Sequence, residues 1–274
     1  VFAHTCDAMQ ALSDLWRMNS EPSRFVDTIM QPANLGTPAA RPYLIAELNR
    51  FRANLASYAG RLVDDDELNS SIGLYDESRR LVQAFQGLRD RISSAHFFAV
   101  LDAGQRMPRE RFNPLLSELV AAMQTAPAQA TGPGLFLTGA VLDEARVLEL
   151  IDELGARVVG DDLCSGSRHF HDHVGSGGDP IASLAEYYLR RPPCPTKFQP
   201  SHQSGDYLLE LIRRDKADGV VFVLEKFCEP HAFDFALALP ALDDASVPHL
   251  LLEMEQTPSV EALRTRLQAF VEML

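Results

Sequence analysis

From residue 134 onward, short apolar runs alternate with amphipathic stretches, and this alternation restricts the fold more than any other feature of the chain. Val220–Leu224 is entirely apolar and is typical of a strand buried on both faces. The same pattern predicts strands at Leu135–Thr138, Arg157–Gly160 and Pro248–Glu253, and helices at Asp143–Leu154, Ile181–Arg190, Tyr207–Arg214, after Pro230 and from the capping residue Ser259 to Leu274. We therefore expect an α/β fold in which helices flank a parallel sheet.

The first half of the chain has a different pattern. Residues 1–19 are typical of a strand end, a turn and a helix. Residues 20–37 contain proline, asparagine and glycine in a pattern typical of a loop. From about Arg41 to Met123 the apolar spacing is helical throughout, which predicts a helical insertion. A linker of Ala, Pro, Gln and Gly follows, so we expect an N-terminal domain over 1–124 and an α/β domain over 134–274. Because the chain opens at Val1 inside a predicted strand, we also expect residues to precede it.

Composition excludes some classes of function. The chain has 274 residues with a formal net charge of −13, so nucleic acid is not an expected partner. No apolar run approaches the roughly 20 residues of a membrane span, so no membrane is expected either. The four cysteines are widely spaced and form no disulfide framework, which favours a cytoplasmic location.

Two cysteines occupy equivalent positions in this pattern. Cys6 and Cys228 each follow an apolar run and precede a helical segment. A thiol at a helix N-terminus is stabilised as the thiolate by the helix dipole and by unpaired backbone N–H groups. Thiolates favour zinc, copper or iron–sulfur centres, so the pair predicts ligands of one metal centre. A zinc site that includes His231 or His4 and a packing role for each buried thiol are the alternatives.

Polar side chains gather where the predicted strands end. They are Asp161, Asp162, Cys164, Ser165 and Arg168 after one strand, Glu225 and Lys226 after the next, and Glu253 and Glu255 after the last. The carboxyl ends of parallel strands meet at one edge of the sheet, where α/β proteins bind ligands. We therefore expect an active site at this edge, although the first group would also suit a structural turn.

Four stretches occur together in one order: His4–Gln10, Gly160–Arg168, Lys226–His231 and Leu263–Leu267. With them the chain resembles the 2-hydroxyacyl-CoA dehydratase family, which includes the benzoyl-CoA reductase subunits. The resemblance implies Rossmann-like α/β halves and a 4Fe-4S cluster held by three cysteines, two of which match Cys6 and Cys228. It places the third upstream of this chain, and Cys164 is the candidate within it.

The resemblance also implies a reaction and partners. Members of the family eliminate water from a 2-hydroxyacyl-CoA by a one-electron ketyl radical mechanism. They work as heterodimers with a homologous second subunit, and the heterodimer receives its electron from an ATP-dependent iron–sulfur activator protein. Asp161, Asp162, Ser165, Arg168 and His231 are then candidates for the cluster or substrate pocket. Acid–base candidates are Glu225, Lys226, Glu253 and Glu255. Reduction of an aromatic acyl-CoA, electron transfer without an acyl-CoA site, and a zinc-stabilised α/β binding module are the alternatives.

Overall fold

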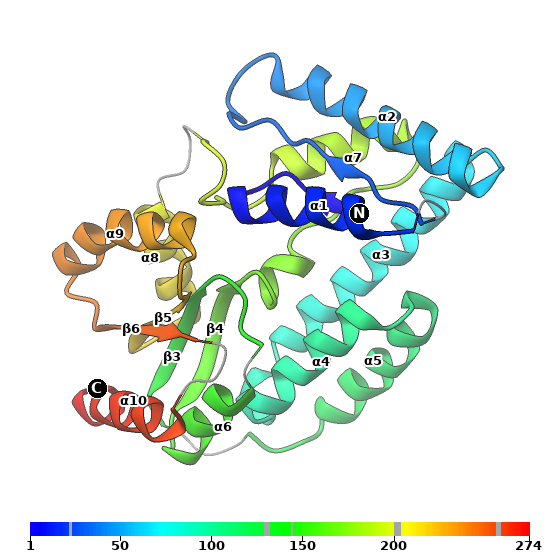
Figure 1. Cartoon of the computed structure of the whole chain (residues 1–274). Coiled ribbons are helices and arrows are strands. Elements are labelled where there is room, and N and C mark those ends of the chain that lie inside the picture. Colours follow the sequence, from blue (N-terminus) through cyan, green and yellow to red (C-terminus); the bar gives the residue numbers. More distant parts are fainter. Residues whose placement is uncertain (22–23, 129–131, 144, 200–203, 256–258) are drawn as a thin grey trace. The chain divides into compact units, whose positions relative to one another are not determined.

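The computed structural model describes residues 1–274 except 22–23, 129–131, 144, 200–203 and 256–258. Within this part of the chain, contacts define two compact units (Figure 1). Unit 1 combines Val1–Asp76 with Asp172–Gln203, and unit 2 combines Glu77–His171 with Ser204–Leu274. These contacts group residues differently from the composition change near residue 124, and the domains 1–124 and 134–274 stay a prediction.

Unit 2 contains a parallel sheet of four strands. They are β3 (Gly134–Gly139), β4 (Arg157–Leu163), β5 (Gly219–Glu225) and β6 (His249–Met254), arranged in the order β4-β3-β5-β6. All four predicted strands are confirmed, although β4 extends three residues beyond the predicted Gly160. The chain leaves β3 toward β4 and later returns to add β5 on the other side. The carboxyl ends of β3 and β5 therefore form the switch point at which such sheets bind ligands.

Helices cover both faces of this sheet, which confirms the α/β prediction (Figure 1). Leu135 and Leu137 of β3 point into a core with α6 and α10, while Phe136 between them packs with α8 and α9 on the opposite face. This alternation is the period of two that a strand imposes on its side chains. The four helices are α6 (Ala145–Glu153), α8 (Ser204–Asp215), α9 (Glu229–Asp244) and α10 (Val260–Met273).

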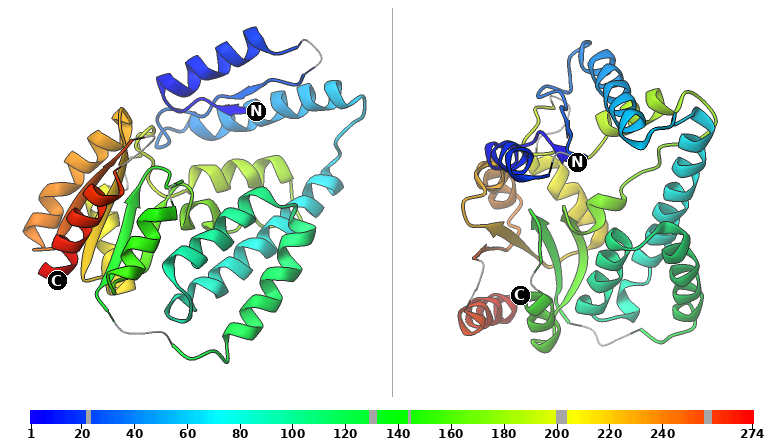
Figure 2. Two further views of the ribbon diagram at one scale, coloured as in Figure 1. Left: turned by 60° about the horizontal axis from the view of Figure 1, so that its bottom comes forward. Right: turned by 45° about the vertical axis from the view of Figure 1, so that its right-hand side comes forward.

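The predicted helical region is also helical in the structure. The second half of α3 (Asp65–Gln86) lies beside α4 (Ser94–Arg106) and α5 (Arg109–Met123) in unit 2, with a short 3-10 turn at Arg89–Arg91 (Figure 2). Phe85 and Phe97 stack with ring centroids 4.7 Å apart. Their core is continuous with the α6 and α10 face of the sheet, so the part of the helical region from Glu77 to Met123 belongs to the same packed body as the sheet.

Unit 1 is built around two minimal parallel strands, β1 (Phe2–Ala3) and β2 (Thr28–Ile29). The expectation of a loop over 20–37 is wrong at Thr28–Ile29, because backbone hydrogen bonds to β1 make these residues a short strand. Helix α1 (Asp7–Asn19) follows β1, and α2 (Ala40–Ala59) packs Leu44 and Leu48 against α7 (Pro180–Leu189). Among the described helices, none is long and apolar enough to cross a membrane.

Candidate functional site

Cys6 lies in unit 1, at the N-terminus of α1. Its backbone is extended and it forms the N-cap of α1, with its carbonyl accepting from Gln10 N at 3.1 Å. The thiol makes no capping hydrogen bond and is partly buried. Strand β1, which precedes Cys6, pairs with β2, and His4 N donates to Ile29 O at 3.0 Å. The paired strands therefore set where this thiol is presented.

Strand β2 is in turn fixed to α2 by a charged network. Arg50 Nη1 contacts Asp27 Oδ1 at 3.0 Å, its Nη2 reaches Glu47 Oε1 at 2.7 Å, and the same nitrogen donates to Thr28 O at 2.7 Å. Glu47 Oε1 also accepts from Met30 N at 2.8 Å. Hydrogen bonds from Arg50 lower the pKa of Glu47, which keeps the carboxylate charged.

Cys228 has the equivalent position in unit 2. It is the N-cap of α9, makes no capping hydrogen bond, and follows β5 through a turn closed by Cys228 N to Glu225 O at 2.9 Å. The residue before it, Phe227, has a φ of 70° and is 90% exposed. A left-handed conformation is unfavourable for a bulky residue. The turn therefore places an exposed phenylalanine, Phe227, directly before Cys228 at the end of β5.

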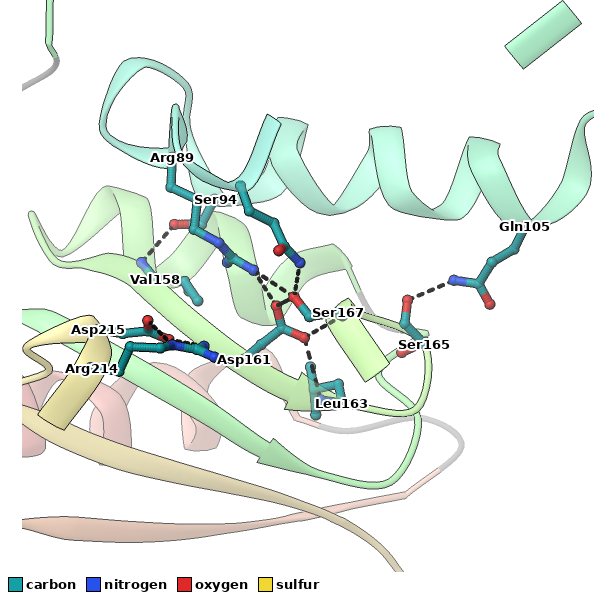
Figure 3. A network of polar contacts seen from close by, with 11 residues as sticks. Arg89, Ser94, Gln105, Val158, Asp161, Leu163, Ser165, Ser167, Arg214 and Asp215 are labelled. Carbon is teal, nitrogen blue, oxygen red and sulfur yellow. Dashed lines mark hydrogen bonds and ion pairs between the residues drawn. The ribbon is translucent and has the colours of Figure 1, made fainter. Parts of the chain in front are cut away.

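Asp161 is a fully buried carboxylate at the end of β4 (Figure 3). Arg89 forms an ion pair with it, while Ser167 donates from Oγ at 2.6 Å and from its backbone N at 2.7 Å. The Arg89 guanidinium carbon lies 3.8 Å from the Phe97 ring centroid. A Cβ on Gly166 would come within 2.0 Å of Asp161 Oδ1, so this close approach requires glycine. Asp161 thus holds the turn after β4 in one conformation.

Asp162, the next residue, faces the other side of the strand and pairs with Arg168, whose Nε lies 3.1 Å from Asp162 Oδ1. Burial raises the pKa of Asp162, against the opposing effect of Arg168. Burial also raises the pKa of the neighbouring Tyr207, and the Asp162 charge adds to it. The pair is therefore an internal polar group beneath the sheet edge rather than a solvent-facing one.

The turn between these pairs carries Cys164 and Ser165. Ser165 Oγ accepts from Leu142 N at 2.9 Å. Ser165 O accepts from Gln105 Nε2 at 2.7 Å, as Figure 3 shows. Cys164 N donates to Ala140 O at 2.9 Å, and the Cys164 residue is exposed. The loops after β3 and β4 are thereby joined to each other and to α4.

His231 lies in the first turn of α9 and lines a small hollow at the carboxyl ends of β3 and β5, together with Thr138, Gly139 and Asp234. The hollow measures about 10 Å³, room for about one water molecule. Burial lowers the pKa of His231 to about 4, and the nearby Arg168 charge acts in the same direction. His231 is therefore neutral at pH 7 and can accept a hydrogen bond, but it is a weak base.

Four acid–base candidates lie on the strand ends of β5 and β6. Burial raises the pKa of Glu225, the last residue of β5, and Asp143 contributes to the increase. Lys226 Nζ and Glu255 Oε1 form an exposed ion pair at 2.6 Å, and this contact raises the pKa of Lys226. Glu253 is exposed. Among the three carboxylates, Glu225 is the one whose surroundings favour the protonated form.

The structure brings most of the sequence-predicted residues to one edge of the unit 2 sheet, and Cys6 lies in unit 1. Among the described residues, no group of three His, Cys, Asp or Glu side chains is arranged to hold a metal ion. Arg89, the partner of Asp161, was not identified from the sequence. The signal in the sequence is that two adjacent acids, Asp161 and Asp162, share one arginine in their motif, Arg168, so that one acid needs a more distant partner such as Arg89.

Comparison with known proteins gives one consistent result. A family model described as 2-hydroxyglutaryl-CoA dehydratase, D-component, matches residues 1–274. The chain is 29% identical to lactoyl-CoA dehydratase subunit beta of Anaerotignum propionicum over 281 residues, covering 100% of this chain and 74% of that protein. It is 28% identical to a benzoyl-CoA reductase subunit of Thauera aromatica over 284 residues, covering 100% and 73%. The (R)-phenyllactyl-CoA dehydratase beta subunit of Clostridium sporogenes is 26% identical over 275 residues, covering 98% and 73%.

Proposed function

Because the chain belongs to the 2-hydroxyglutaryl-CoA dehydratase, D-component, family, we propose that it is the iron–sulfur subunit of a 2-hydroxyacyl-CoA dehydratase. One observation carries the proposal. Cys6 and Cys228 are both N-caps of helices that follow parallel strands, and neither thiol is used as a cap. Helix N-termini favour the thiolate, which is the form that binds iron.

The donor set has the chemistry that a 4Fe-4S cluster requires. Thiolate sulfur is the usual ligand of such clusters, and Cys6 and Cys228 are both thiols with partial access to solvent. That both bind the same cluster is a proposal that rests on the family resemblance, since they belong to different units. Within this chain, we propose Cys164 as the candidate for the remaining ligand.

When bound, a cluster of this kind supplies single electrons to the acyl-CoA, which makes loss of the hydroxyl group and of an unactivated β-proton feasible. The residues of this chain handle the protons. Glu225 is the leading candidate for the group that holds a proton, because burial raises its pKa. Neutral His231 can accept a hydrogen bond from a group in the hollow that it lines. Lys226, Glu253 and Glu255 are the further acid–base candidates at the same edge.

The buried pairs support this edge. Asp161 and Asp162 direct their carboxylates to Arg89 and Arg168, and Ser165 joins the loops after β3 and β4. We propose that these residues keep the strand ends in position for the acyl-CoA and the cluster. This would be a role of orientation, since their charged groups already have partners within the protein.

The names of the relatives support a multi-subunit enzyme. Lactoyl-CoA and (R)-phenyllactyl-CoA dehydratase are both represented by beta subunits. We propose that this chain pairs with a homologous second subunit, acts on an acyl-CoA in the cytoplasm, and receives electrons from an ATP-dependent iron–sulfur activator protein. Reduction of an aromatic acyl-CoA is the second candidate, favoured by the 28% identity to the benzoyl-CoA reductase of Thauera aromatica.

Anaerobic reconstitution with iron and sulfide tests the proposal. We expect an EPR or Mössbauer signal of a 4Fe-4S cluster, which Cys6→Ser and Cys228→Ser each abolish while Cys194→Ser retains it as the matched control. With the partner protein and the activator present, a 2-hydroxyacyl-CoA and benzoyl-CoA are assayed in parallel. Tightly bound zinc without iron would instead support the α/β binding module.

A further inference from the structure

A lysine from a distant segment contacts the backbone two residues before Cys6. Lys197 Nζ donates to His4 O at 3.2 Å, although the two residues are 193 positions apart in sequence. Both lie in unit 1, Lys197 in its second segment and His4 in its first. The ammonium group is part-buried, so its charge is screened less by water than that of an exposed lysine.

The backbone on the lysine side of this contact is fixed. Lys197 N donates to Cys194 O at 2.8 Å, which closes a turn. The next residue, Phe198, donates to Ala33 O at 2.8 Å and accepts from Leu35 N at 2.9 Å. These bonds attach the lysine segment to the loop that follows β2.

The backbone on the cysteine side is fixed as well. His4 N donates to Ile29 O on β2, and β2 is held to α2 through Arg50 and Glu47. Lys197 therefore completes the bonding of His4, whose N–H and carbonyl are both engaged just before the Cys6 N-cap. A rigid second layer of contacts of this kind orients metal ligands and tunes the metal.

We propose that Lys197 is a positioning residue for the Cys6 loop and that its positive charge favours the reduced state of the cluster. The inference rests on the proposed function, since it concerns the cluster assigned to Cys6. Its physical basis is electrostatic: reduction adds a negative charge, and a part-buried cation attracts that charge more strongly than a fully solvated cation would, because water screens it less. Cluster potentials respond to local charge and to hydrogen bonding around the ligands.

The test compares Lys197→Met, Lys197→Gln and Lys197→Arg after anaerobic reconstitution, with Lys216→Met as a control on an exposed lysine of unit 2. Midpoint potentials are measured by EPR-monitored redox titration, and iron and sulfide are quantified separately. For the Met and Gln variants we expect a roughly tenfold lower ratio of reduced to oxidised cluster at a given potential, or about 59 mV for one electron. The Arg variant should restore the wild-type potential.

Each outcome bears on a different statement. A wild-type protein that assembles no cluster refutes the proposed function itself. If the wild type assembles one and the Gln and Arg variants share its potential, the inference about Lys197 is wrong. A Met variant that fails to fold leaves the comparison of Gln with Arg to decide, because the two differ in charge. A change of the same size in Lys216→Met would also overturn the inference.

Discussion

At the scale of single residues, His231 stands out because its burial conflicts with its ability to carry charge. It lies three residues after Cys228, faces Arg168, and lines the hollow at the ends of β3 and β5. The folded protein therefore keeps the imidazole neutral, with a pKa of about 4 against 6.5 for an unperturbed histidine. This difference links proton binding to folding.

We expect the stability of the apoprotein to depend on His231 between pH 4 and about 6.5. In this window the unfolded chain binds a proton that the folded chain does not, so the free energy of unfolding rises with pH and levels off above about 6.5. The full shift would correspond to about 3 kcal/mol, reduced by the partial exposure of the ring. Urea unfolding at several pH values measures it.

The matched control is His231→Gln, which cannot titrate. Its pH profile should lack the contribution of His231 while retaining that of the carboxylates. Parallel profiles for the two proteins between pH 4 and 6.5 would contradict the assignment.

The residues at the end of β4 show how far sequence reasoning reaches. The sequence predicts the acids Asp161 and Asp162 at a strand end, and they lie there. The partner of Asp162 is six positions away in the same motif, but that of Asp161 is Arg89, which is 72 positions away in a helical region. A local sequence pattern indicates that a buried acid needs a partner. It does not identify the distant segment that supplies this partner.

At the scale of elements, the helical region is attached to the sheet at the β4 edge. Arg89 pairs with Asp161, Val158 N donates to Ser94 Oγ at 3.0 Å, and Gln105 Nε2 donates to Ser165 O (Figure 3). These contacts come from the 3-10 turn and from α4. The position of the turn that carries Cys164 therefore depends on the position of these helices.

Removing one partner of the Arg89–Asp161 pair should destabilise unit 2 strongly. Arg89→Met leaves a buried carboxylate without its cation, and Asp161→Asn leaves the guanidinium without its anion, each at a cost of about 3–5 kcal/mol. The double variant should cost clearly less than the sum of the two. Denaturant unfolding of all four proteins gives the coupling energy.

Arg106→Met is the control for this cycle, because Arg106 pairs with Asp102 on the exposed surface of α4. Its stability should match that of the wild type. Additive effects of Arg89→Met and Asp161→Asn would show that the buried pair does not join the two elements.

Element prediction succeeded where burial is continuous and failed where pairing is minimal. The apolar run at β5 is buried along nearly its whole length, so its sequence alone identifies it. Strand β2 has only two residues and lies between Pro22 and Pro32, and it exists because β1 pairs with it. The make-up of unit 1 was also beyond local reasoning, since Asp76 joins its two segments by accepting from Val174 N at 2.9 Å.

At the scale of the whole molecule, the two proposed cluster ligands come from different units. Cys6 is held by β1 and α1 in unit 1, and Cys228 by β5 and α9 in unit 2. A ligand that binds only the native form stabilises it. A cluster bound by both cysteines should therefore stabilise the chain only when both thiols are present.

Cluster loading should raise the midpoint of thermal unfolding by on the order of 5 °C. Cys6→Ser and Cys228→Ser should each lose the whole increase, although they lie in separate units, and Cys194→Ser should keep it. Anaerobic differential scanning calorimetry of loaded and unloaded protein measures the difference. An increase that survives in either of the first two variants would contradict shared ligation.

The composition of unit 1 from two separated segments has a consequence for synthesis. Cys6 and β1 leave the ribosome well before Lys197, which belongs to the second segment. At 5–20 residues per second, the roughly 190 residues from Cys6 to Lys197 take on the order of 10–40 s to translate. During that time the nascent chain exposes the Cys6 loop without its ammonium contact. The loop that carries Cys6 can therefore form its full set of contacts only after Lys197 has been synthesised, which is well after the Cys6 thiol has emerged.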